Sequence, residues 1–132
     1  MAEFYIGLMS GTSLDGVDGV IARFDHLGGL DVLAHATSPL PHALRAELVA
    51  LNSPGGQDEL HRAALAANGL ARVYAEVVGQ LLASTPEAHG AIRAIGAHGQ
   101  TIRHRPLEFD GVGYTLQLNN PALLAELTGI DV

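Results

Sequence analysis

The segment from Met9 to Asp18 holds the densest set of groups that could do chemistry in this chain. Its two glycines let backbone N–H groups come close to a bound phosphate, and its serine and threonine hydroxyls add further donors. Asp15 and Asp18 supply carboxylate oxygens of the kind that a hydrated Mg²⁺ binds. The segment could therefore hold the terminal phosphates of a nucleotide together with Mg²⁺. Composition alone favours a plainer role, because Gly, Ser and Asp dominate ordinary hairpin turns.

A second polar group, His98 to Thr101, directly follows the apolar run 91–97. Strand ends of open α/β sheets are where ligands bind. His98 and Gln100 can each donate and accept hydrogen bonds, which suits the hydroxyl or acetamido groups of a sugar. His98 could equally do no more than hold the loop backbone in place. Just beyond it, the basic cluster 103–105 could attract a carboxylate or form a solvated loop.

Short apolar runs at the start of the chain predict the strands that must position the first polar segment. These runs cover 4–9, 19–25 and 30–37. Parallel neighbours need a crossover of a dozen or more residues, and the connections here are shorter. The sequence therefore predicts that the chain opens with three antiparallel strands.

The pattern then changes to helical spacing. We expect a helix up to Leu51 and a long helix over 58–84 that the pair Asn68-Gly69 weakens. Two further strands are expected over 91–97 and 114–118. A short helix over 121–127 follows, and residues 130–132 begin another strand. Asn120 could face a ligand or cap the helix that follows it. This order predicts an α/β fold and the N-terminal portion of a longer protein.

Composition excludes several classes of function. The chain has 132 residues, of which 48% are hydrophobic and 16% are charged, with 14 acidic against 7 basic residues. The formal net charge of −7 argues against a nucleic-acid partner. There is no Cys and no Lys, which excludes disulfides, thiolate zinc sites, a Walker A lysine and Schiff-base chemistry. With no targeting segment and no apolar run near the ~20 residues of a membrane span, we expect a cytoplasmic protein without a membrane partner.

Three strings of the sequence together resemble the anhydro-N-acetylmuramic acid kinase family, within the sugar kinase and actin superfamily. They are residues 7–18, 96–106 and 116–130, and they occur in the family's order over almost the whole chain. Asn119 departs from the family pattern, which more often has glycine there, so this turn is expected to differ slightly. Family members are far longer than this chain, which resembles roughly their first third.

The resemblance implies a fold and a reaction. The fold is the N-terminal part of an actin-like, ribonuclease H-like ATPase domain, and residues 1–132 would be a partial N-terminal domain of a two-domain sugar kinase. The reaction is ATP-dependent, Mg²⁺-assisted ring opening and phosphorylation of 1,6-anhydro-N-acetylmuramic acid to N-acetylmuramic acid 6-phosphate, in cell-wall recycling. No catalytic residue is assigned, because the general-base aspartate is expected beyond Val132; the chain alone is expected to be inactive, and its parent to be a homodimer.

The resemblance also implies roles for individual residues. Those expected to contact ATP are Gly11, Thr12, Ser13, Leu14, Asp15, Gly16, Val17 and Asp18. Mg²⁺ would be held at Asp15 or Asp18, a choice that the sequence leaves open. Those expected to contact the amino sugar are His98, Gly99, Gln100, Thr101 and Asn120.

Two other functions fit parts of the same pattern. One is a non-catalytic module that binds a sugar or a protein partner on an actin-like half-domain and needs no ATP. The other is a different sugar or acid kinase of the same superfamily. The string 98–106 argues against the second, because it is more specific to the family than the phosphate segment is.

Overall fold

A mixed four-stranded sheet forms one layer of the computed structural model, which describes residues 2–132. Its strand order is β3-β2-β1-β4, with bounds β1 (Glu3–Ser10), β2 (Gly16–Phe24), β3 (Leu30–Pro39) and β4 (Ile92–Ala97). The first three strands pair antiparallel, whereas β1 and β4 pair parallel. The order of elements therefore places the first strand at the centre of the sheet, next to a strand from much later in the chain.

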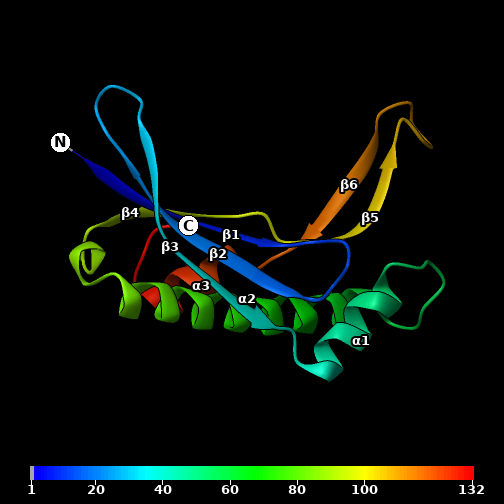
Figure 1. Ribbon diagram of the computed structural model, residues 1–132. Coiled ribbons are helices and arrows are strands. Elements are labelled where there is room, and N and C mark those ends of the chain that lie inside the picture. The colour runs from blue at the N-terminus through cyan, green and yellow to red at the C-terminus, as the bar shows by residue number, and fades with distance from the viewer. Residues whose placement is uncertain (1) are drawn as a thin grey trace.

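Helices form the second layer. They are α1 (His42–Leu51), α2 (Glu59–Ser84), the short 3₁₀ turn η1 (Pro86–Ala88) and α3 (Pro121–Thr128). The long helix α2 runs beneath the sheet (Figure 1) and contacts β2, β3, α1 and α3. It continues without a break through Gly69, where a Cβ atom would lie 3.2 Å from Leu44 Cδ1 of α1. This glycine lets α1 and α2 approach closely. Across 2–132, no helix has the length and apolar character needed to cross a membrane.

The core lies between α2 and the lower face of the sheet. Alternate residues of the strands point toward it, as the two-residue period of a strand requires. The fully or almost fully buried apolar side chains of this contact are Ile6, Leu8, Val17, Ile21, Ile95, Leu70, Tyr74, Val77, Val78 and Leu81. The sheet is therefore held flat against one long helix, which fixes where its strands end.

Two strands form a separate hairpin, and the sequence predicted only the second of them. β5 (Gln100–Pro106) pairs antiparallel with β6 (Gly113–Leu118), and the hairpin rises away from the main sheet (Figure 1). The expectation of a loop over 103–105 is wrong. Arg103 and Arg105 are half-buried and His104 between them is exposed, so pairing with β6 rather than apolar patterning defines the strand. Residues 130–132 form no strand, but the Asp131 carbonyl accepts a hydrogen bond from the Ile95 N–H at 2.8 Å.

We predict that Gly19→Ala destabilises the fold by about 1–3 kcal/mol, because it overpacks the contact between sheet and helix. A Cβ atom at residue 19 would lie 2.6 Å from Val77 Cγ1 and 2.9 Å from Leu8 Cδ2, both in the core. The measurement is the free energy of unfolding in urea.

The matched control for this prediction is Gly79→Ala in α2, where a Cβ atom would meet nothing within 4 Å. This change is expected to stabilise the protein by up to about 1 kcal/mol, because alanine is the better helix former. Equal effects of the two substitutions would contradict the packing argument.

Candidate functional site

The two polar segments singled out by the sequence meet at one edge of the sheet. Because β1 and β4 are parallel neighbours, with Leu8 opposite Ala97, the loops that follow them leave the sheet side by side. The His98 N–H extends this pairing by donating to the Leu8 carbonyl at 3.1 Å. The carboxyl ends of adjacent parallel strands are the usual place for a ligand in an α/β sheet. After the ligands that the sequence predicts for them, we call the loop after β1, residues 11–15, the phosphate loop, and residues 98–99 the sugar loop.

The phosphate loop is a tight turn whose end is held by hydrogen bonds and whose hydroxyls are exposed. The Leu14 N–H donates to the Gly11 carbonyl at 3.1 Å, and the side chains of Thr12 and Ser13 between them are exposed. Leu14 has a positive φ of 56° and is buried, and its carbonyl accepts a hydrogen bond from Arg45 Nε of α1 at 3.1 Å. A left-handed leucine persists only where its surroundings hold it. These contacts hold the end of the loop at Leu14 and leave the hydroxyls of Thr12 and Ser13 exposed.

Not every residue assigned to ATP can offer its side chain. Leu14 and Val17 are core residues, so contact with a ligand would involve their backbone only. Gly16 is required by close packing, because a Cβ atom there would lie 2.5 Å from the Ser38 carbonyl oxygen. The groups left exposed are the two hydroxyls described above and two carboxylates.

The two carboxylates have different surroundings. Asp15 lies in the loop and is exposed, whereas Asp18 lies within β2, with Oδ1 3.4 Å from Nε2 of His35 on β3. Over the described part of the chain, no three His, Asp or Glu side chains come together as a metal site. Mg²⁺ keeps several waters and takes one or two carboxylates plus phosphate oxygens, so a single loop carboxylate fits it. The loop position makes Asp15 the better placed of the two.

The sugar loop turns sharply at Gly99. Its φ is +81°, and a Cβ atom would lie 2.5 Å from the Leu118 carbonyl oxygen, so only glycine fits. The neighbouring His98 is exposed, with Nδ1 3.0 Å from the Gly99 carbonyl oxygen. Both roles considered for His98 thus remain visible in the structure. One ring nitrogen contacts the loop backbone, and the exposed ring can still reach a ligand.

Gln100 and Thr101, also assigned to the sugar, are more enclosed. Gln100 is 1% exposed, and its Oε1 has no hydrogen-bond partner within residues 2–132. A buried amide oxygen without a partner costs stability. A ligand or water molecule that donated a hydrogen bond to it would recover this free energy. Thr101 Oγ1 accepts a hydrogen bond from Gln117 Nε2 of β6 at 3.1 Å. Contact of these residues with a sugar stays a prediction.

Asn120 caps a helix. Its Oδ1 accepts from the Leu123 N–H of α3 at 3.0 Å, and its Nδ2 donates to Asn68 Oδ1 of α2 at 2.8 Å. Of the two roles predicted for Asn120, the structure shows the cap, and both polar groups of the side chain are used within the chain. The pair also explains Asn68, which the sequence marked only as a weak point of the helix. Together the two asparagines tie the start of α3 to α2, beneath the sugar loop.

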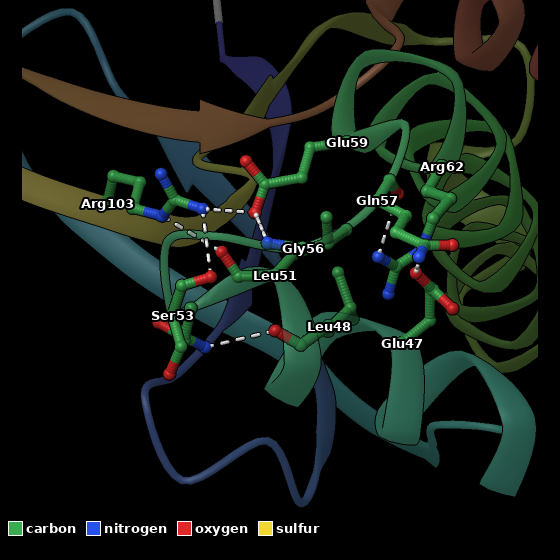
Figure 2. Close-up of polar contacts among 10 residues, drawn as sticks. Glu47, Leu48, Leu51, Ser53, Gly56, Gln57, Glu59, Arg62 and Arg103 are labelled. Carbon is green, nitrogen blue, oxygen red and sulfur yellow. Dashed lines mark hydrogen bonds and ion pairs between the residues drawn. The ribbon is translucent and has the colours of Figure 1, made fainter.

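Arg103 is an anchor between elements and not a free cation (Figure 2). Its Nε donates to the Leu51 carbonyl at the end of α1, and its Nη2 donates to Ser53 O and to Glu59 Oε1, at 3.0, 3.0 and 2.8 Å. A cation at a helix C-terminus satisfies carbonyls that lack partners within the helix. These contacts tie β5 to the loop between α1 and α2. Of the two roles considered for this cluster, the solvated loop is wrong, because residues 103–105 lie in β5; attraction of a ligand carboxylate stays a prediction.

Two buried hydroxyls that the sequence did not assign to the site lie where both loops begin. The Oγ of Ser10, the last residue of β1, is 3.5 Å from the Tyr74 hydroxyl of α2 and 3.5 Å from the Gly99 carbonyl oxygen. Burial raises the pKa of Tyr74, and hydrogen bonds to Ser10 and the Gly99 backbone partly offset this rise. The helical spacing marked Tyr74 only as a core residue, because no one-dimensional pattern shows that a hydroxyl has a partner.

Comparison with known proteins assigns the chain to one group. The family model described as anhydro-N-acetylmuramic acid kinase matches residues 3–132. Relatives carrying that name include proteins from Variovorax paradoxus (69% identical over 98% of this chain and 34% of the relative) and Albidiferax ferrireducens (68% over 100% and 33%). A relative from Cupriavidus metallidurans is 58% identical over 99% of this chain and 34% of its own length. The chain spans about a third of the length of these relatives.

We predict that Arg103→Ala lowers the free energy of unfolding by about 2 kcal/mol, as expected for the loss of charge-assisted hydrogen bonds from a largely buried group. The control is Arg105→Ala, which removes an exposed pair with Glu108 at 3.4 Å and is expected to cost at most about 0.5 kcal/mol. Denaturant unfolding of both variants tests this difference. An Arg103 variant with the same free energy of unfolding as the original chain would show that these hydrogen bonds do not contribute to stability.

Proposed function

The chain belongs to the anhydro-N-acetylmuramic acid kinase family, and we propose that it forms the phosphate-binding part and one side of the sugar-binding part of such a kinase. The observation that carries this proposal is the placement of the phosphate loop and the sugar loop at the carboxyl ends of the parallel neighbours β1 and β4. A phosphoryl donor on one loop and an acceptor on the other would lie next to each other. The fold would be the first part of an actin-like, ribonuclease H-like domain of a two-domain enzyme.

The proposed reaction joins a hydrolysis and a phosphoryl transfer. Water attacks the anomeric carbon of 1,6-anhydro-N-acetylmuramic acid, the 1,6-anhydro bridge opens, and the freed O6 takes the γ-phosphoryl group of ATP. The products are N-acetylmuramic acid 6-phosphate and ADP. Phosphoryl transfer depends on positioning and on neutralising charge, while the water needs a general base. We propose that this base is an aspartate carried by the part of the family protein that follows the matched segment.

The residues of this chain would divide the work between the two loops. Backbone N–H groups and the hydroxyls of Thr12 and Ser13 would bind the terminal phosphates. Mg²⁺, held through Asp15, would neutralise part of the phosphate charge. His98 would hydrogen-bond the sugar, with Gln100 reached only if the sugar loop shifts. The homodimer and the cytoplasmic location stay predictions.

We predict that the 132-residue chain alone binds Mg²⁺-ATP weakly and shows no turnover. The phosphate loop is preformed, but the proposed base lies elsewhere in the family protein. Calorimetric titration with Mg²⁺-ATP and with the anhydro sugar measures binding, and release of ADP measures turnover. Phosphorylation of the sugar by the purified chain would contradict the division of roles.

The assignment of Mg²⁺ is tested in a chimera in which this chain replaces the matching third of the Variovorax paradoxus relative. We predict that Asp15→Asn lowers kcat with ATP by about 10²-fold, as expected for loss of a group that neutralises transition-state charge. Asp18→Asn is the matched control, because Asp18 lies in β2 beside His35; its effect should be under tenfold. The reverse order of effects would assign the metal to Asp18.

A further inference from the structure

Three elements meet at one buried polar point beneath the candidate site. β1 contributes Ser10, α2 contributes Tyr74, and the sugar loop contributes the backbone of Gly99. Ser10 is 2% exposed and Tyr74 is fully buried, within a core whose other large members are almost all apolar. Figure 1 shows α2 passing under the sheet, and Tyr74 is a buried residue of this helix.

We propose that Ser10 and Tyr74 are positioning residues that set the spacing between the phosphate loop and the sugar loop, an inference that rests on the proposed function. Ser10 is the residue directly before the phosphate loop, and its hydroxyl contacts the carbonyl of Gly99 in the sugar loop at 3.5 Å. Tyr74 lies on a helix that does not belong to either loop, and it holds the serine hydroxyl from the core side. Neither side chain touches the proposed substrates.

Burial is what gives this contact its influence on geometry. In a low-dielectric interior a polar group without a partner is costly, so the buried hydroxyls of Ser10 and Tyr74 favour the arrangement in which they contact each other and the serine contacts the Gly99 carbonyl. A packed apolar contact would tolerate a slide of the loops by a fraction of an ångström with little loss. The backbone bond from His98 to Leu8 fixes the sugar loop to β1 at only one point. The contact between the Ser10 hydroxyl and the Gly99 carbonyl adds a second point of attachment. Two points of attachment fix the direction of the sugar loop as well as its position.

Spacing matters here because the two reactants would sit on different loops. If the sugar O6 is displaced from the γ-phosphoryl group, water can take that group instead, giving ADP and inorganic phosphate without sugar phosphate. A displacement of about 1 Å can cost a reaction 10²-fold. Loss of the contact is therefore expected to uncouple ATP hydrolysis from sugar phosphorylation, and this is a result that simple loss of folded protein does not produce.

The test uses the same chimera with the variants Tyr74→Phe and Ser10→Ala, and it measures ADP and sugar phosphate in the same samples. The original sequence should give about one ADP per sugar phosphate, as the proposed reaction requires. Each variant should lower sugar phosphorylation by about tenfold or more and raise the ratio of ADP to sugar phosphate severalfold. Tyr74→Phe preserves the ring and so keeps the core filled. The double variant should lose no more than Ser10→Ala alone, because Ser10→Ala already removes the one contact that Tyr74→Phe breaks.

The matched control is Val78→Ala, which trims a buried side chain one helical turn from Tyr74 and touches no polar partner. It should reduce folded protein and total activity while leaving the ratio at about one. Tyr74 or Ser10 variants that keep the ratio of the original sequence, or a control that raises it equally, would overturn the inference. A folded original chimera that binds Mg²⁺-ATP but forms no sugar phosphate would overturn the proposed function, and the inference with it.

Discussion

The parallel pairing of β1 with β4 is the constraint on which the rest of this structure depends. Parallel neighbours need a long crossover, and here the crossover contains two strands and two helices. Its long helix α2 packs under the sheet, where it contacts β2 and β3. The pairing brings together two loops that are far apart in the sequence. Each loop alone is an ordinary turn; side by side, they form the edge at which we propose that a phosphoryl donor and its acceptor meet.

The hydrogen-bonding side chains around this edge orient the chain in a way that apolar packing cannot. Apolar packing between α2 and the sheet supplies the driving force for folding, since it is roughly proportional to the area buried. It is not directional, however, and cannot by itself fix the angle at which a loop leaves a strand. Hydrogen bonds can: those of Asn120 orient the start of α3, and that of Arg45 orients the phosphate loop. A site built from two loops needs such directional contacts at each loop.

Local patterns in the sequence predicted the helices and most of the strands, because these elements bury one face and so repeat apolar residues at a fixed period. The turns within the two polar segments, residues 11–15 and 98–99, could be predicted as loops, because glycine, serine and aspartate are typical of turns. The ends of both segments lie in strands, at Gly16 in β2 and Gln100 in β5. β5 could not be predicted, because among its residues Ile102 is a buried apolar side chain while three positive or polar residues follow it. The contacts of Tyr74 and Asn68 could not be predicted either, since each partner is more than fifty residues away.

The second string of the family resemblance, residues 96–106, shows why a motif does not reveal the role of each of its members. Its first half turns through Gly99 at the candidate site, while its second half continues as β5 toward the helices. Arg103 has the chemistry to bind a carboxylate, but its place in β5 sets it against the end of α1, where it donates hydrogen bonds to the carbonyls of Leu51 and Ser53. A guanidinium with several partners in the fold has few donors left for a ligand. One string thus combines residues that would meet the substrate with residues that hold the hairpin against the helices.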